Sequence, residues 1–434
     1  MSRVHDHADA SPSASTSAHK ASASSLWRDR DFLVYWLGQS VSRGGTRVAE
    51  FSLPLAAIFL FDASSSQLGV INALAFVPYL VMTLFAGVWI DRSRKRRVLI
   101  VAELGRIVVL GAAFVVYLSG NLPLVGFYLI ALLLGVCAVL FDISGAAYLP
   151  VLINREQLVE GNAKLQATIV VTQSGGPAVG GVLTQFLSAS TVFFGSMIGP
   201  LVSLLTLGAI RHREDAPETP ATRRATFREI REALVFILRD RYLRFLTLRS
   251  GVNNIFFMAR NTILPLFVLQ TLDLSTGSLG VILGAGSVGG FVGALVSRPL
   301  ADKLGPGRVI TLGYAGSSLS QVVLPLAGGS TATAMAMLVP MFFVSGLFMT
   351  VGNTNVAALQ QLMIPKRQLG RVLAGMRTVT WGSMPLGALA GGILASAIGL
   401  REALVVTAVG FCASALWIAL SPVAKLRSVP IPSE

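Results

Sequence analysis

The chain has 434 residues, of which 53% are hydrophobic and 13% are charged, and its formal net charge is +14. Soluble domains carry about 25% charged residues, so this composition excludes an ordinary soluble enzyme or binding domain. Windows without a single charge cover 68–90, 122–141 and 309–338. A helix of about 20 residues spans the roughly 30 Å hydrocarbon core of a bilayer. The sequence therefore predicts an all-α, multi-pass membrane protein that is not an enzyme.

The first 25 residues are rich in serine and alanine and lack the apolar core of a secretory signal. We therefore expect residues 1–25 to form a disordered tail. Cys137 and Cys412 both lie within apolar segments, where we expect small packing residues. The sequence predicts no disulfide, no metal site and no cofactor.

Apolar runs between polar breaks predict twelve membrane spans in two groups of six. The predicted spans are 33–61, 66–90, 98–118, 122–148, 165–187, 190–210, 243–271, 276–300, 309–327, 331–357, 372–398 and 401–421. They define an N-terminal six-helix bundle (26–210), a linker (211–242), a C-terminal six-helix bundle (243–421) and a tail (422–434). In the linker, residues 227–238 show the amphipathic pattern of a helix on a membrane surface.

The connections between predicted spans alternate between basic and non-basic segments. The basic ones are 91–97, 211–244, 297–308 and 365–371, and on the other side the only basic residue is Arg401. Short loops with Lys and Arg remain in the cytoplasm, so we expect both termini there. The positive charge is then explained by topology and contact with anionic lipids, and not by nucleic-acid binding.

The second half of the sequence repeats the first at a constant distance. The tetrapeptide Leu-Gly-Val-Ile at 68–71 recurs at 279–282, 211 residues later. Asp91 recurs as Asp302 at the same distance, and the glycine pair 180–181 recurs at 391–392. The constant distance predicts two pseudo-symmetric six-helix bundles, the layout of transporters whose halves move about a central site.

Three short motifs lie in or between the predicted spans. The first, GVWIDRSRKRRVL, covers 87–99, and the second, GPAVGG, covers 176–181. The third, GAGSVG at 284–289, fits a dinucleotide-binding pattern, but that pattern must follow a strand and open a helix. Because 284–289 lies inside an apolar span, we interpret it as a site of close helix packing.

The first two motifs resemble those of the major facilitator superfamily, and the resemblance covers residues 26–421. Motif A of that family reads roughly G-x-L-a-D-R-x-G-r-k-x-x-l, and Arg94 replaces its second glycine here. GPAVGG resembles the end of the helix 5 motif of proton-coupled drug exporters, and Ala163 and Thr172 replace two earlier glycines of that motif. The segment 148–166 resembles bacterial exporters of antibiotics and siderophores. The resemblance implies a transporter in the bacterial inner membrane.

We expect motif A to lock one conformation of the transporter. An aspartate there can accept hydrogen bonds from a helix N-terminus, and the basic residues can pair with acidic groups of the other half. Breaking these contacts would release the conformation. The residues assigned to this gate are Gly87, Asp91, Arg92, Lys95, Arg96 and Asp302.

Ionisable residues inside a span are costly and by default indicate function. Arg43, Arg47 and Glu50 stand at i, i+4 and i+7, on one helical face. Two cations would keep Glu50 ionised, so an anionic substrate group and a proton would compete for one network. Asp142 either faces the cavity or joins the motif A network. Glu103 follows the motif A loop by a few residues and is expected to brace the cytoplasmic end with Arg106.

Two polar residues of the second half complete the predicted coupling site. Asn261 lies 211 residues after Glu50, so pseudo-symmetry places it across the cavity, and Arg260 precedes it. Arg260 either lines the cavity or pairs with an acid. The residues assigned to substrate binding and proton coupling are Glu50, Arg47, Arg43, Asp142, Arg260 and Asn261.

Glycines in the fifth and eleventh spans are expected to form the seam between the two halves. Small residues four apart let another helix approach closely, and Pro177 removes a backbone N–H and favours a bend. The resemblance implies that helices 5 and 11 pair with helices 8 and 2. The seam residues are Gly176, Pro177, Gly180, Gly181, Gly387 and Gly391.

These patterns predict a monomeric secondary transporter that exports amphipathic small molecules, such as drugs or siderophore-like compounds, by proton antiport. The chain carries no nucleotide-binding P-loop motif, so we do not expect ATP to drive it. Two alternatives stay open: a facilitator or importer of a metabolite that works without protons, and a membrane sensor that transports nothing.

Overall fold

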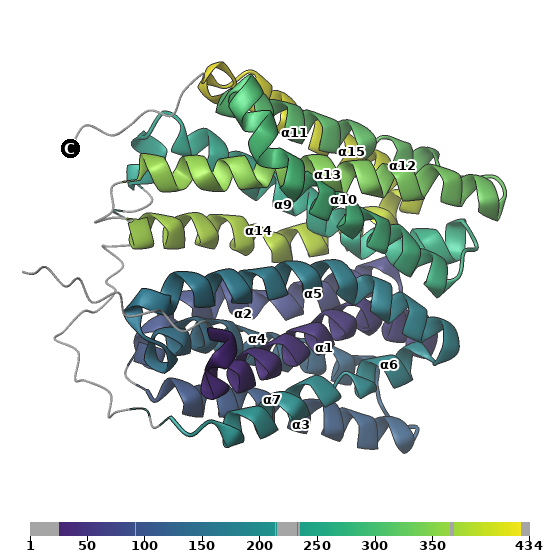
Figure 1. Cartoon of the computed structure of the whole chain (residues 1–434). Helices are drawn as coiled ribbons and strands as arrows, with labels where there is room; N and C mark the ends of the chain where they lie inside the picture. Colours follow the sequence, from purple (N-terminus) through teal and green to yellow (C-terminus); the bar gives the residue numbers. More distant parts are fainter. Residues whose placement is uncertain are drawn as a thin grey trace, which may run out of the picture.

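The computed structural model describes residues 26–91, 93–212, 214, 232, 235–364 and 369–426. Every regular element within these ranges is a helix. The predicted N-terminal tail, most of the linker, and residues 427–434 lie outside the described residues. Of the predicted amphipathic segment 227–238, residues 232 and 235–238 are described, and they are helical. The described helices form two stacked units, coloured purple to teal and green to yellow in Figure 1.

The first unit contains the six predicted spans, the last of which is interrupted by a turn. Its helices are α1 (Arg30–Phe61), α2 (Ser65–Asp91), α3 (Lys95–Leu118), α4 (Leu124–Leu152), α5 (Leu158–Phe186), α6 (Ala189–Gly195) and α7 (Ile198–Ala209), with short helices η1 (Leu26–Arg28) and η2 (Arg155–Gln157) at the ends of α1 and α5. The second unit follows the same plan. Its helices are α9 (Leu243–Leu266) continued by η3 (Phe267–Thr271), α10 (Thr276–Leu304), α11 (Pro306–Ser320) with α12 (Val323–Leu326), α13 (Thr331–Met363), α14 (Leu369–Ile398), α15 (Leu400–Ala419) and η4 (Pro422–Lys425).

Eleven helical segments among the described residues are long and apolar enough to cross a membrane. The twelfth span is α5, which has 29 residues and so is also long enough to cross a bilayer. Its glycines and polar residues lower its mean hydropathy, and it contacts α1 on one side and α10 on the other. The predicted all-α fold of twelve membrane helices is confirmed.

The duplication appears directly in the helix bounds. The helices α2, α3, α5 and α6 begin at Ser65, Lys95, Leu158 and Ala189, and α10, α11, α14 and α15 begin 211 residues later, at Thr276, Pro306, Leu369 and Leu400. The turn after the first helix is also repeated. Asp62 (φ 47°) and Asp273 (φ 51°) are the non-glycine residues with a left-handed backbone in the described chain, and they too are 211 residues apart. Two pseudo-symmetric units are therefore confirmed.

Serine residues cap three of the helices that follow the non-basic loops, α6, α10 and α13. The hydroxyls of Ser188, Ser275 and Ser330 accept hydrogen bonds from backbone N–H groups three residues later, at 3.1, 3.1 and 3.2 Å. Such caps satisfy otherwise unpaired N–H groups at the start of a helix. At the same end, Arg401 donates to the carbonyls of Pro325 and Ala327 at 2.7 and 3.0 Å. This contact accounts for a basic residue in an otherwise non-basic set of loops.

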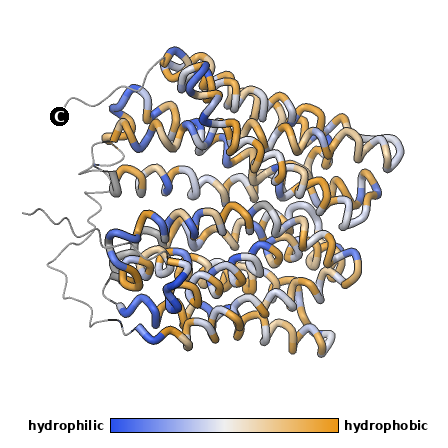
Figure 2. The backbone as a smooth tube through the Cα atoms, in the orientation of Figure 1, coloured by the Kyte–Doolittle hydropathy of each residue, from blue (hydrophilic) through white to orange (hydrophobic). Residues whose placement is uncertain are grey.

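The outer surface of both units is apolar along most of the helix length. Figure 2 shows hydrophobic colour along the helices and hydrophilic colour gathered at the end that carries the basic loops. Large apolar side chains such as Val108, Val115 and Leu205 are more than 60% exposed. In a soluble protein such a surface would be a liability, and here it faces lipid.

Candidate functional site

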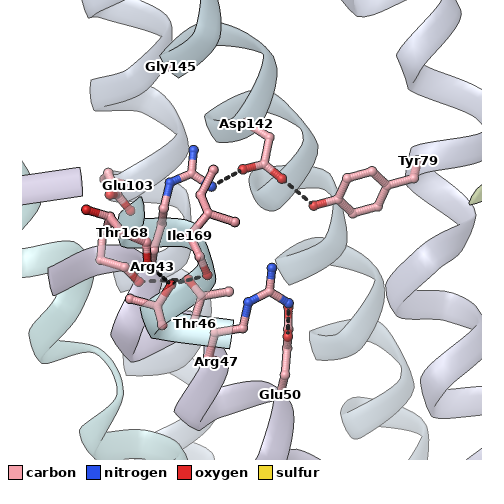
Figure 3. Close-up of polar contacts among 12 residues, drawn as sticks. Arg43, Thr46, Arg47, Glu50, Tyr79, Glu103, Asp142, Gly145, Thr168 and Ile169 are labelled. Carbon is pink, nitrogen blue, oxygen red and sulfur yellow. Dashed lines mark hydrogen bonds and ion pairs between the residues drawn. The ribbon is translucent and has the colours of Figure 1, made fainter. Parts of the chain in front are cut away.

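The first ionic cluster joins three helices of the first unit (Figure 3). Arg43 of α1 donates from Nη1 to Oδ1 of Asp142 on α4 at 2.9 Å. The second carboxylate oxygen of Asp142 accepts a hydrogen bond from the hydroxyl of Tyr79 on α2 at 2.8 Å. Both oxygens of Asp142 are thus occupied, and its charge is balanced by Arg43. The alternative in which Asp142 faces the cavity agrees with this position, because Asp142 lines a cavity described below.

The second ionic pair lies on α1 itself. Arg47 donates from Nη1 to Glu50 Oε2 at 2.6 Å, and 48% of the Glu50 side chain is exposed. The expectation that one acid is held by two cations is wrong. Although Arg43, Arg47 and Glu50 share a helical face, α4 offers Arg43 a carboxylate of its own. Each arginine therefore has a separate acidic partner.

A third pair is buried within α3 and its neighbours. Arg106 donates to Glu103 Oε2 at 3.3 Å and to the Ser42 hydroxyl at 3.3 Å. The Phe141 ring lies next to two guanidinium groups. Its centroid is 4.6 Å from Cζ of Arg106 and 5.3 Å from Cζ of Arg43. Three arginines and three carboxylates therefore balance one another inside the first unit. Glu103 and Arg106 form the expected pair. Arg106 also lines a cavity, a position that the sequence analysis did not predict.

Two neighbouring cavities lie against these ion pairs. The larger has an empty volume of about 680 Å³, and the smaller about 340 Å³. The larger is lined by Gly45, Thr46, Ala49, Glu50, Leu53, Ala75, Phe76, Tyr79, Arg106, Leu110, Ala131, Leu134, Gly135, Ala138, Phe193, Ser196 and Pro200. The smaller is lined by Arg43, Thr46, Arg47, Glu50, Tyr79, Arg106, Ala138, Phe141, Asp142, Ile169 and Thr172. A mostly apolar wall with a few convergent polar groups, as in the larger cavity, is typical of a small-molecule site.

The sequence reasoning did not single out Tyr79, which lines both cavities and binds Asp142. Its only sequence signal is that it is a tyrosine inside a long apolar run, because a buried hydroxyl usually requires a partner. Arg260 and Asn261 lie elsewhere: Arg260 is buried in the second unit and donates to Asn261 Oδ1 at 2.8 and 3.3 Å. Neither residue belongs to the walls of the two cavities.

Motif A lies at the basic end, between α2 and α3. The carboxylate of Glu214 accepts hydrogen bonds from the backbone N–H groups of Lys95 and Arg96 at 2.7 and 3.1 Å, so it caps the N-terminus of α3. The Arg96 side chain donates to the Leu207 carbonyl at the end of α7 at 2.5 and 3.0 Å. Arg96 therefore contacts the end of α7 in its own unit, and the pairing of the basic motif residues with acids of the other half stays a prediction.

The remaining motif A residues are only partly described. Gly87 belongs to the last turns of α2, and Asp302 is exposed near the end of α10. The side chain of Asp91 and the whole of Arg92 lie outside the described residues. Sequence reasoning also missed Glu214, whose signal is an acidic residue soon after the last span of the first unit.

We predict that Glu214→Gln lowers the thermal stability of the protein. A carboxylate at a helix N-terminus contributes about 0.3–1 kcal/mol, so the apparent Tm of the purified protein should fall by a few degrees. Glu156→Gln, the same change at an exposed carboxylate, should leave the Tm unchanged. Equal Tm values for both variants would contradict the capping role of Glu214.

The two units meet through two helix pairs, α2 with α14 and α5 with α10, and these are the expected pairs of helices 2 with 11 and 5 with 8. At one contact, a Cβ placed on Gly280 would come within 2.5 Å of the Gly181 Cα. At the other, a Cβ on Gly69 would come within 3.1 Å of the Gly392 Cα. The two contacts are equivalent under the 211-residue repeat, because Gly69 corresponds to Gly280 and Gly181 to Gly392.

Most of the glycines expected at the seam pack inside their own unit. Cβ atoms on Gly176 and Gly180 would meet Arg47 and Phe51 of α1, and Cβ atoms on Gly387 and Gly391 would meet Ile255 and Ala259 of α9. Only Gly181 of the expected set faces the other unit. The two four-residue glycine spacings therefore pack α5 on α1 and α14 on α9. Pro177 lies inside α5 without ending it.

The family model of the Major Facilitator Superfamily matches residues 35–380 and 263–433. Macrolide efflux protein A of Streptococcus pyogenes is 22% identical over 86% of this chain and 91% of its own length. The multidrug efflux pump Tap of Mycolicibacterium fortuitum is 25% identical over 78% of this chain and 83% of its own. The enterobactin exporter EntS of Citrobacter koseri is 25% identical over 61% of this chain and 62% of its own length.

Solved structures show the same fold. An inward-facing bacterial homologue of the iron transporter ferroportin has a TM-score of 0.72 and 17% identity, covering 90% of this chain and 98% of that one. The nucleoside transporter NupG also has a TM-score of 0.72, at 10% identity, and the match covers 90% of this chain and 98% of NupG. The twelve helices in two duplicated units define a membrane-transporter fold. The chain belongs to the major facilitator superfamily.

Proposed function

We propose that this transporter exports amphipathic small molecules by proton antiport, through alternating access. The observation that carries the proposal is the arrangement of Glu50 and Asp142. Each is a carboxylate paired with its own arginine on a cavity wall: both line the smaller, more polar cavity, and Glu50 also lines the larger, mostly apolar one. Ionisable groups are retained inside membrane proteins where they serve ion or substrate pathways.

The ion pairs give a simple basis for exchange between protons and substrate. A proton on Asp142 cancels the charge that holds Arg43, and a proton on Glu50 does the same for Arg47. A substrate whose binding favours the charged carboxylate expels the proton, so the two occupants exclude each other and their movements are coupled.

The chemistry of the larger cavity supports an amphipathic substrate. Its wall combines alanine, leucine and phenylalanine side chains with Glu50, Tyr79 and Arg106. The relatives' names concern the efflux or export of macrolides, of multiple drugs and of enterobactin. Export is the direction those names share.

The proposed orientation places the basic loops and both termini in the cytoplasm of a bacterial cell. The basic ends of the helices, including Lys95, Arg96 and Arg308, would then contact anionic lipid headgroups of the inner membrane. Two other functions, a proton-independent facilitator or importer and a non-transporting sensor, lack an observation that favours them over the exporter.

Uptake into inside-out membrane vesicles tests this proposal. Radiolabelled erythromycin, ethidium and tetraphenylphosphonium serve as substrates, with and without an imposed pH gradient. Wild-type vesicles should accumulate at least one compound when the lumen is acidic, and collapse of the gradient should abolish accumulation. Glu50→Gln should lower gradient-driven uptake at least tenfold, because an amide cannot carry the proton.

Two results would reject specific parts of the proposal. Uptake that is indifferent to the gradient, or unchanged in Glu50→Gln, would reject proton coupling through this site. Accumulation in right-side-out vesicles alone would reject export. Glu402→Gln, at a carboxylate in the first turn of α15 at the non-basic end, is the matched control and should transport normally.

A further inference from the structure

The two seams between the units share one kind of contact near the non-basic ends of their helices. Gly69 of α2 meets Gly392 of α14 there, and Gly181 of α5 meets Gly280 of α10. The seams differ further toward the basic end, where Tyr79 lies ten residues after Gly69. At the rise of an α-helix, this second level is about 15 Å from the glycine contact.

Two successive side chains of α2 meet α14 at this second level. The ring centroid of Tyr79 lies 5.1 Å from that of Trp381, with an angle of 58° between the ring planes. A Cβ placed on Gly382 would come within 2.7 Å of Leu80 Cδ1. Aromatic rings with centroids roughly 4.5–7 Å apart attract each other beyond the area that they bury. The α2–α14 seam is therefore held by side chains in the middle of the helices.

The α5–α10 seam lacks this contact. The 211-residue repeat places Gly290 of α10 at the position of Tyr79, and Val170 of α5 at that of Trp381. A Cβ added to Gly290 would have only atoms of Thr350 and Gly346 of α13 within 4 Å. Since no described atom of α5 lies that close, the two helices are not bridged at these positions. The second level of contact is specific to α2 and α14.

The Tyr79 ring is also tied to an ionisable group of the first unit (Figure 3). Its hydroxyl donates to one oxygen of Asp142 at 2.8 Å, and Arg43 donates to the other at 2.9 Å. The counterpart of Asp142 in the second unit is the neutral Asn353, which accepts a hydrogen bond from Tyr314 of α11 at 3.0 Å. The sequence of carboxylate, tyrosine and tryptophan thus joins the two units at one seam.

Several charged side chains surround this connection. Glu50 is the other carboxylate on the wall of the smaller cavity, which Asp142 and Tyr79 also line. A test must therefore distinguish protonation of Asp142 from protonation of Glu50. The remaining charged groups on the neighbouring helices are Arg43 and Arg47 of α1, Arg106 of α3 with its partner Glu103, the buried Arg260 of α9, and Arg377 one turn before Trp381 on α14.

We propose that Tyr79 is a positioning residue through which the charge of Asp142 controls contact between α2 and α14. The inference rests on the proton antiport proposed above and specifies where the proton acts. A hydrogen bond to an ionised carboxylate is about twice as strong as one to a neutral group. The ionised Asp142 therefore holds the Tyr79 ring against Trp381. A proton on Asp142 weakens this bond, so that the ring can leave Trp381 and the seam can open.

The fluorescence of Trp381 tests this connection without substrate or transport. The chain has five tryptophans, and replacing Trp27, Trp36, Trp89 and Trp417 by phenylalanine leaves Trp381 as the sole indole. Quenching by acrylamide is measured on this purified variant at pH 8 and pH 4. The quenching constant should be at least twofold higher at pH 4, because Trp381 loses its ring contact. If size exclusion shows that this variant does not fold, the difference between wild type and Trp381→Phe isolates the same signal.

Substitutions in this background assign the pH response. Asp142→Asn should give the high quenching constant at both pH values, because the amide carries no charge. Tyr79→Phe should do the same, because it keeps the ring and loses the hydroxyl. Glu50→Gln should keep the wild-type response, since the partner of Glu50 is Arg47. Glu402→Gln, at the non-basic end, is the matched control and should also keep it.

Uptake into inside-out vesicles tests whether the contact serves transport. Trp381→Ala should lower gradient-driven uptake at least fivefold. Trp417→Ala is the matched control, because the Trp417 ring lies 5.6 Å from that of Phe245 in its own unit, and it should keep uptake within twofold. Wild-type uptake by Trp381→Ala would overturn the inference.

The fluorescence outcomes separate this inference from the proposed function. A quenching constant that does not change with pH, or a response that survives Asp142→Asn or Tyr79→Phe, would overturn the inference. So would a response that only Glu50→Gln removes. Wild-type uptake that ignores the pH gradient would contradict proton antiport, and the Trp381 response would then still decide whether Asp142 controls the seam.

Discussion

Gly181→Leu is expected to abolish transport while the protein still inserts and folds. In the structure, α5 and α10 approach so closely that a Cβ on Gly280 would come within 2.5 Å of the Gly181 Cα. A leucine side chain cannot fit between two backbones at this distance. The non-basic ends of the two units could then no longer meet, so the conformation described here would be lost from the cycle. We expect uptake into vesicles to fall more than tenfold.

Two variants of the same helix are controls for the seam. Gly175 has no neighbouring atom within 4 Å of an added Cβ, so Gly175→Leu should insert and transport normally. Gly180 faces Phe51 of the same unit, so Gly180→Leu should lower the Tm without removing the contact between units. Normal transport by Gly181→Leu would refute the seam. The pseudo-symmetric variant Gly392→Leu should also lower uptake, because a Cβ on Gly392 would come within 2.9 Å of the Gly69 Cα.

Asp142→Asn is expected to abolish gradient-driven transport. Asp142 accepts hydrogen bonds from Arg43 at 2.9 Å and from Tyr79 at 2.8 Å, so it joins three helices. Hydrogen bonds to charged groups contribute about 1.5–3 kcal/mol each, and the amide leaves Arg43 without a counter-charge. We expect at least a tenfold loss of uptake and a lower Tm, measured on membranes with equal protein content.

The double variant Asp142→Asn with Arg43→Gln separates stability from coupling. Removing both charges avoids an unpaired cation, so the Tm should recover relative to Asp142→Asn alone, while gradient-driven uptake stays low. If uptake recovers together with the Tm, the pair is structural and the proton is carried elsewhere. Tyr79→Phe, which removes one hydrogen bond and no charge, should lower uptake less than Asp142→Asn.

The sequence predicted the fold well because membrane spans are local features. A span depends on about 20 successive apolar residues, so all twelve could be read from the chain with ends within a few residues. The 211-residue repeat could be read for the same reason, and α10 and α14 begin where it places them. Even α5, whose glycines and proline weaken its helical signal, is one helix from Leu158 to Phe186.

The four predicted coupling residues of the first unit lie together at the cavities, whereas Arg260 and Asn261 lie elsewhere, and several predicted partners differ from those in the structure. Arg43 and Glu50 share a helical face, but the partner of Arg43 is Asp142, 99 residues away. Gly176 and Gly180 were expected to face the other unit and instead pack on α1. The spacing of residues along one helix fixes which of them share a face. It does not fix which neighbouring helix that face meets.

The sequence alone therefore determined the class of protein, the number of spans, the duplication and the small set of ionisable residues inside the spans. These properties follow from hydropathy and periodicity, which act over a few helical turns. The tertiary structure decided which arginine holds which carboxylate, which glycine faces the other unit, and which aromatic side chains meet across the seam. Those properties depend on packing between helices far apart in the chain.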